Sequence, residues 1–236
     1  MFSAPVSWTD KTYFCCAVTL YGIAMVYSVF LWRKGFQRDD WVVYGMLAGG
    51  WVLHTVAMVK RGFNLEACPI TNLYEATAFI MWTIVAGYLV VGVWQRFRFV
   101  GAFASPLLFL LGVFALFPDM DPELAPGSHK FSGALSSLHK ALLLLSFGGF
   151  GLSAVGAVMF LTQEKDLKLH KFRAILSKLP SLERLEVAMT RLVWIAFGLL
   201  TAGLVTSSAY LHQVKNVWFQ PDPEMLWVIG VWIFYL

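Results

Sequence analysis

The chain has 236 residues, of which 58% are hydrophobic and only 14% are charged, and its formal net charge is +4. A soluble domain carries about 25% charged residues, so this composition excludes an ordinary water-soluble domain. Apolar stretches of about 18 or more residues recur, each long enough to cross the ~30 Å hydrocarbon core of a bilayer. The stretches are continuously apolar rather than alternating, which argues against a β-barrel. The composition predicts an all-α fold, a polytopic transmembrane helical bundle that forms a single membrane domain over residues 1–236.

The apolar runs, taken in chain order, predict six full spans and an incomplete seventh. The fourth run contains Pro106, where we expect a kink that neighbouring helices can accommodate. The seventh begins near residue 225 and is still apolar at Leu236, so we expect that the sequence stops inside a helix. The six full spans are predicted at roughly 12–32, 41–59, 72–94, 99–117, 137–162 and 192–211.

Lysine and arginine are concentrated in alternate connections between these spans. The first, third and fifth connections are basic, the fourth and sixth are not, and the second, with Lys60 and Arg61, is ambiguous. Because cytoplasmic loops carry the excess of Lys and Arg, the bias predicts an N-terminus outside the cell. We expect a multi-pass protein embedded in the lipid bilayer of the bacterial cell (inner) membrane. Its basic surplus lies in loops that follow the positive-inside rule, so it requires no nucleic-acid partner. Residues 163–191 are predicted to form a cytoplasmic amphipathic loop with a helix along the interface.

Ionisable residues inside membrane spans are costly and therefore indicate functional positions. His54 lies near the outer end of the second predicted span, and Arg61 follows seven residues later on the same helical face. A neutral imidazole can ligate haem iron, and an arginine on that face can pair with a propionate. The alternative is a histidine hydrogen-bonded to a neighbouring helix. Gly50, one turn before His54, would allow close approach of either a flat ligand or another helix.

Glu75 lies at the outer start of the third predicted span and has two interpretations. Asn72 precedes it by three residues, and Pro69 precedes both, which is the pattern of a capping box at a helix N-terminus. The functional interpretation is an acid that supports a neighbouring ligand.

His139 opens the fifth predicted span at its outer end, and it is either a ligand or an interfacial histidine in contact with water. The small residues Ser146, Gly149, Ser153 and Gly156 form a stripe below it, which favours close helix packing. His212 closes the sixth predicted span, again outside.

These residues and the loop that contains Trp218 and Trp227 are all predicted on one side of the membrane. Their segregation indicates a single outward-facing site. Histidines with exposed tryptophans suit a planar aromatic cofactor, because imidazole can bind the metal and indole can cover the ring. Asp222, within the loop, could orient a ligand or hold the loop shape.

The motifs around these residues resemble those of the haem-handling cytochrome c assembly family, the CcsA/ResC and CcmC group with its HemX-like relatives. His54-Thr55 with Arg61 resembles the family's HT…R segment, and residues 69–76, PITNLYEA, resemble its P-x-S-N-x-Y-E-S element. Leu138-His139 keeps the spacing of the LH…LSY segment. Residues 218–227, WFQPDPEMLW, resemble the tryptophan-rich WWD loop, which is near YWSWDPKETW in family members.

The resemblance implies that the protein binds haem b as transported cargo and presents it at the outer face for attachment to apocytochrome c. It implies that His54 is an in-membrane iron ligand and that His139 is an external one. Trp218, Asp222 and Trp227 would be the retained parts of a haem-cradling outer loop over residues 213–225. A ResB/Ccs1-like membrane partner is implied as well, and the chain alone is not expected to be an enzyme.

The loop departs from the family pattern, since Pro221 stands where a tryptophan is expected before the acid. In the family, a second external histidine and a second in-membrane histidine normally follow this loop, and the sequence ends before both. Either the sequence is incomplete, or a shorter member of the family binds haem differently. Two alternatives therefore stay open. One is a HemX-like membrane protein that modulates haem synthesis without delivering haem, which the altered loop favours. The other is a small-solute transporter, which would have paired broken helices near the membrane midplane.

Overall fold

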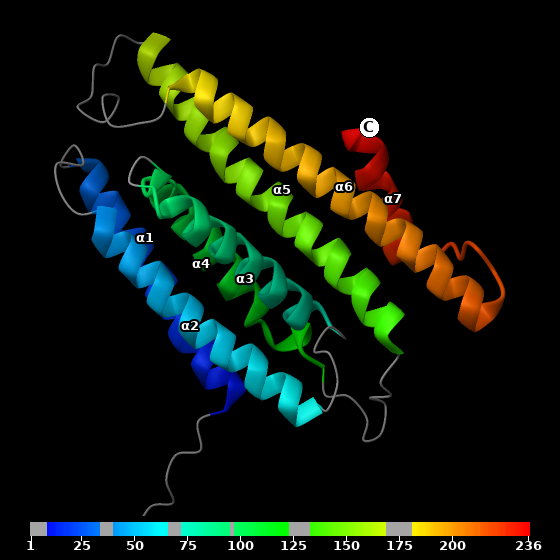
Figure 1. Ribbon diagram of the computed structural model, residues 1–236. Helices are drawn as coiled ribbons and strands as arrows, with labels where there is room; N and C mark the ends of the chain where they lie inside the picture. Colours follow the sequence, from blue (N-terminus) through cyan, green and yellow to red (C-terminus); the bar gives the residue numbers. More distant parts are fainter. Residues whose placement is uncertain (1–8, 34–39, 66–71, 95–96, 123–132, 169–180) are drawn as a thin grey trace, which may run out of the picture.

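Seven α-helices and one short 3-10 turn make up almost all of the chain that the computed structural model describes, which is residues 9–33, 40–65, 72–94, 97–122, 133–168 and 181–236 (Figure 1). The described residues contain no strand, so the all-α prediction is confirmed. The elements are α1 (Asp10–Arg33), α2 (Asp40–Leu65), α3 (Leu73–Gly92), α4 (Val100–Ala115), η2 (Pro118–Met120), α5 (Gly133–Lys168), α6 (Leu182–Lys215) and α7 (Pro223–Tyr235).

Consecutive helices from α1 to α6 run up and down the bundle. Figure 1 shows that α2, α4 and α6 end where α1, α3 and α5 begin, at the lower right of the view. We call this the cavity end, defined as the end of the bundle at which α2 ends and α3 begins. The sequence bias in Lys and Arg predicts that this end faces outward.

Five of the helices are long and apolar enough to cross a membrane, namely α1, α2, α3, α5 and α6. The prediction of six full spans is therefore too high by one among the described residues, because α4 has only 16 residues. At 1.5 Å per residue that is about 24 Å, less than the ~30 Å hydrocarbon core. Helix α4 continues through Pro106. Proline has no N–H to donate to the carbonyl of Ala102, four residues earlier, and the Ser105 hydroxyl donates to that carbonyl instead at 3.5 Å.

Helices α5 and α6 are longer than the sequence pattern indicates. They have 36 and 34 residues, or about 50 Å each at 1.5 Å per residue, so both extend past the hydrocarbon core. Residues 182–191 are helical as predicted, but they are the first turns of α6 and not a separate interfacial helix. Ser181 caps this start by accepting from the Arg184 amide, and Leu185 is buried. The remainder of the predicted cytoplasmic loop, 169–180, lies outside the described residues.

The predicted stripe of small residues packs α5 against α6. A Cβ on Gly149 would lie 3.0 Å from the Ala196 Cβ, and one on Gly156 would lie 2.8 Å from the Met189 Cγ. The Ser153 hydroxyl donates to the Met189 carbonyl across this contact. The packing interpretation of the stripe is confirmed, since these positions are occupied by the neighbouring helix.

Helices α1 to α4 share one apolar core with part of α5 and the beginning of α6, and α7 packs on the α5–α6 pair through a second cluster. Tyr235 of α7 stacks on Phe150 of α5 at 4.1 Å between ring centroids. The Trp232 Nε1–H donates to the Thr201 hydroxyl of α6 at 3.0 Å. These contacts place the beginning of α7 at the cavity end beside α5 and α6.

Candidate functional site

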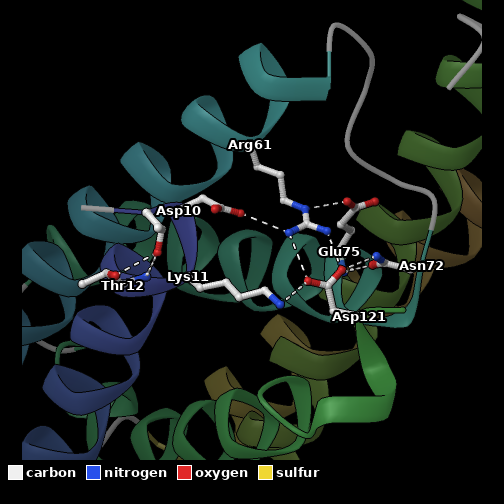
Figure 2. Close-up of polar contacts among 8 residues, drawn as sticks. Asp10, Lys11, Thr12, Arg61, Asn72, Glu75 and Asp121 are labelled. Carbon is white, nitrogen blue, oxygen red and sulfur yellow. Dashed lines mark hydrogen bonds and ion pairs between the residues drawn. The ribbon is translucent and has the colours of Figure 1, made fainter. Parts of the chain in front are cut away.

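A cluster of charged side chains joins four elements at the cavity end (Figure 2). Arg61, in the last turns of α2, is 14% exposed and donates to three carboxylates. Its Nε bonds Glu75 of α3 at 2.6 Å, its Nη1 bonds Asp10 of α1 at 3.0 Å, and its Nη2 bonds Asp121 after η2 at 2.5 Å. We call the six residues Asp10, Lys11, Arg61, Asn72, Glu75 and Asp121 the Arg61 cluster.

Asp121 is the most heavily bonded acid of the Arg61 cluster. Besides Arg61, it accepts from the Lys11 Nζ at 2.7 Å and from the Asn72 Nδ2 at 2.7 Å. Burial alone would raise the pKa of this carboxyl, but the hydrogen bonds from Arg61 and Lys11 hold its pKa below the usual value. Asp121 therefore stays ionised and links α1, α2 and α3 to the end of α4.

The structure bears out the helix cap in the first interpretation of Glu75, and it pairs the carboxylate with an arginine. Asn72 caps α3 as predicted, since its Oδ1 accepts from the Glu75 amide at 2.8 Å. The Glu75 carboxylate binds Arg61, so the arginine predicted to meet a propionate meets protein carboxylates instead. Sequence reasoning missed Asp10 and Asp121 because each lies more than 50 positions from Arg61. The one signal in the sequence that could have found them is that each acid lies directly outside an apolar run.

His54 lies in the packed interior between α1, α2 and α3 and is fully buried. A Cβ on Gly50 would lie 2.5 Å from the Tyr21 ring, so this glycine admits a neighbouring helix. The Tyr21 hydroxyl is 3.4 Å from the His54 Nδ1, and the Phe14 ring lies edge-on at 5.0 Å. The predicted shared face is confirmed, since His54 and Arg61 both point toward α1. The His54 Nε2 has no hydrogen-bond partner among the described residues.

The pocket that Arg61 lines is much smaller than a porphyrin, and His54 does not line it. The pocket beside Arg61 holds about 10 Å³ and is lined by Phe14 and Tyr74 among others. That volume is close to the minimum for one water molecule. His54 and Arg61 therefore do not face a common haem-sized cavity in this arrangement.

A much larger cavity lies at the same end of the bundle, between α3, α5, α6 and the beginning of α7. Its volume is about 750 Å³, within the range of cofactor and small-molecule sites. His139 and Asp222, both predicted site residues, line it. The other lining residues are Asn72, Leu73, Ala76, Ser136, Lys140, Leu143, Leu144, Phe147, Leu204, Ser207, Tyr210, Leu211, Glu224, Met225 and Val228.

His139 is the histidine of this cavity. Its ring stacks on Tyr210 of α6, with 5.5 Å between centroids and 28° between planes. The imidazole lies near the backbone of Leu135, but its buried Nδ1 makes no hydrogen bond of acceptable geometry within the described chain. A ring held by stacking, on a cavity wall of mostly apolar residues, can bind a flat iron-containing ligand. Asn72 lines the same cavity, so the Arg61 cluster supports one wall directly.

The tryptophans of the outer loop do not line the cavity. Trp218 stacks on His212 at 4.0 Å, and the Ser208 hydroxyl donates to its carbonyl. Trp218 is 63% exposed and Trp227 is 70% exposed. Of the three predicted loop residues, Asp222 alone lines the cavity. Its Oδ1 accepts a hydrogen bond from the side-chain Nε2 of Gln220 at 3.0 Å.

The expected single site is thus brought together only in part. His139 and Asp222 share the cavity, and Arg61 and Glu75 lie behind its α3 wall. His54 lies in the packed core and the two tryptophans face outward. The described residues contain no group of three or more His, Cys, Asp or Glu that could hold a metal ion.

These features define a multi-pass helical membrane protein with a large cavity at one end of its bundle. Each described span is one continuous helix, without the paired breaks of a transporter midplane site. The chain belongs to the cytochrome c assembly protein family, whose sequence model matches residues 70–236.

Individual relatives agree with this family. The protein named HemX of Brevibacillus brevis is 25% identical over 94% of this chain and 80% of its own length. The cytochrome c biogenesis protein CcsA of Trieres chinensis is 23% identical over 93% of this chain and 78% of its own. The CcsA of Prochlorococcus marinus (strain MIT 9301) is 27% identical over 78% of this chain and 66% of its own. The chain therefore spans about two thirds to four fifths of these relatives.

Proposed function

We propose that the protein binds haem in the cavity beside His139 and presents it at the outer face of the membrane for attachment to apocytochrome c. The observation that carries this proposal is the ~750 Å³ cavity with an imidazole on its wall. Membership of the cytochrome c assembly family supports it, as do the relatives named cytochrome c biogenesis protein CcsA.

Several residues in and around the cavity have a defined part in this proposal. His139 ligates the iron, because neutral imidazole is a common axial ligand of haem. Phe147, Tyr210 and the leucines of α5 and α6 contact the ring and exclude water. Asp222 fixes the loop at the opening by its bond to Gln220. The exposed Trp218 and Trp227 remain on the outer surface, where an incoming apocytochrome or a ResB/Ccs1-like partner can meet them.

His54 belongs to the proposal as an in-membrane ligand, supported by its unpartnered buried Nε2. In the arrangement described here Phe14 and Tyr21 pack on the ring. Ligation at His54 therefore requires α1 to move away from α2, whereas ligation at His139 requires no such movement.

The test is the absorption spectrum of the detergent-purified protein from cells supplied with haem. We expect a Soret band that is lost or strongly reduced in His139→Ala. His212→Ala is the matched control, because His212 lies at the same end of the bundle but stacks on Trp218 outside the cavity. Added imidazole should restore the band in His139→Gly. A colourless wild-type protein, or a His139→Ala spectrum identical to that of the wild type, would contradict the proposal.

A HemX-like role without haem delivery is the second candidate. Two observations favour it, namely the match to the HemX of Brevibacillus brevis and the position of the tryptophans outside the cavity. Reconstitution with apocytochrome c and a ResB/Ccs1-like partner separates the two roles. Covalent haem attachment that depends on this chain supports delivery, while haem binding without attachment supports the HemX-like role.

A further inference from the structure

Tyr210 of α6 makes the aromatic contact that holds the His139 ring at the wall of the cavity. The two rings stack with 5.5 Å between centroids and 28° between planes, and both residues line the cavity. These values lie within the range of offset-stacked aromatic pairs. The contact therefore joins the proposed iron ligand on α5 to one particular side chain of α6.

Within the described chain, the His139 ring lacks the hydrogen bond that usually orients a metal-binding histidine. Such a histidine ordinarily donates its other ring N–H to a carboxylate, a carbonyl or water, and this bond fixes the orientation of the ring. The His139 Nδ1 is buried and has no partner of acceptable geometry among the described residues. Since protein encloses Nδ1, Nε2 is the nitrogen through which the ring can meet a ligand in the cavity. The stack on Tyr210 is thus the contact that sets the plane of the imidazole.

Close packing of α5 and α6 holds Tyr210 in this position. A Cβ on Gly203, seven residues before Tyr210, would lie 2.6 Å from the Leu143 Cδ2, and Leu143 lies four residues after His139. A small residue at such a position lets two helices approach closely. Helix α6 is therefore in direct contact with α5 just below the stacked rings, and Tyr210 reaches His139 from a rigid element.

We propose that Tyr210 is a positioning residue for His139, and that its ring holds the imidazole in the plane in which Nε2 meets the iron of bound haem. This inference rests on the proposed function, in which His139 ligates that iron. Without the stack, the imidazole would turn about its side-chain bonds. Ligation would then include the entropic cost of ordering the ring, so the affinity for haem would fall.

The experiment titrates the purified full chain with haem, followed by absorbance, and with protoporphyrin IX, followed by its fluorescence. Protoporphyrin IX has the same ring and the same carboxylates as haem but no iron for His139 to bind. We expect Tyr210→Leu to lower haem affinity about tenfold, because the histidine loses the contact that orients it. The affinity for protoporphyrin IX should change less than about twofold, since leucine keeps the wall apolar. Tyr210→Phe keeps a stacked ring and should bind both ligands as the wild type does.

A double-variant cycle tests whether Tyr210 acts through His139. In the His139→Ala background, Tyr210→Leu should change haem affinity by less than about twofold, because no imidazole remains to be positioned. Where His139→Ala binds no haem, the comparison of the two porphyrins decides alone. Equal losses of haem affinity in the two backgrounds would overturn the proposal. Equal losses for haem and protoporphyrin IX would also overturn it, because Tyr210 would then act on the ring of the ligand or on the fold.

The failure of this inference is distinguishable from the failure of the proposed function. A wild type whose Soret band depends on His139, with a Tyr210→Leu variant of unchanged haem affinity, would overturn the positioning role and leave the proposed function standing. A wild type that binds no haem would refute both.

Discussion

Replacing Asp121 by asparagine tests the Arg61 cluster directly. The aspartate is 11% exposed and accepts from Arg61, Lys11 and Asn72. Asparagine has the same shape, but one oxygen becomes an NH₂ donor that must face an N–H of Arg61 or Lys11. The substitution therefore removes the negative charge and places two donors against each other.

The expected loss is about 2 kcal/mol in the free energy of unfolding. A hydrogen bond to a charged group contributes about 1.5–3 kcal/mol, and breaking a buried pair costs more. Two features lower the estimate. Arg61 keeps its bonds to Glu75 and Asp10, and Lys11 is 55% exposed, so its pairing with Asp121 contributes little. For a chain of this size the loss corresponds to a fall of about 4–8 °C in the melting temperature.

The assay is thermal unfolding in detergent, followed by circular dichroism, with Asp119→Asn as the matched control. Asp119 lies two positions earlier, and its side chain is exposed. We expect Asp119→Asn to lie within about 0.5 kcal/mol of the wild type. Equal melting temperatures for the two variants would show that the Arg61 cluster contributes no net stability, and would refute the reasoning.

The remaining predictions concern the acid dependence of this cluster and two packing contacts. Because the folded-state pKa of Asp121 lies below its unfolded value, the stabilisation by this carboxylate is fully present above about pH 4 and is lost as pH falls through the folded pKa. The difference in unfolding free energy between the wild type and Asp121→Asn should therefore shrink as the pH is lowered, and a constant difference would contradict this. Gly50→Ala should cost about 1–3 kcal/mol, because its Cβ would lie 2.5 Å from the Tyr21 ring, whereas Gly49→Ala should be tolerated, because its Cβ would lie 3.9 Å from the Leu20 Cδ1; similar melting temperatures for the two variants would contradict this, since they would mean that α1 shifts at little cost. Trp232→Phe and Thr201→Val should each cost about 1 kcal/mol through the lost hydrogen bond, and the double variant should cost less than their sum; additive losses would mean that this bond does not join α7 to α6.

The sequence by itself determined the class of fold and most of the helices. A chain in lipid must satisfy its backbone hydrogen bonds within each span, so a long apolar run specifies a helix locally. The second predicted span, the cap at Asn72 and the small-residue stripe of α5 were accordingly correct, although α2 continues to Leu65. The limits of α5 and α6 were underestimated, because tertiary packing extends both helices beyond their apolar segments.

Only the tertiary structure decided which side chains meet. Hydropathy and motif spacing place His54, Arg61, His139 and the tryptophans at one end of the bundle, but they do not specify distances between helices. Packing of α1 against α2 buries His54 under Tyr21 and Phe14, and it brings Asp10 to Arg61 across 51 positions of sequence. The separation of α3, α5, α6 and α7 leaves the cavity at His139. Such contacts depend on how whole helices pack, which no local pattern encodes.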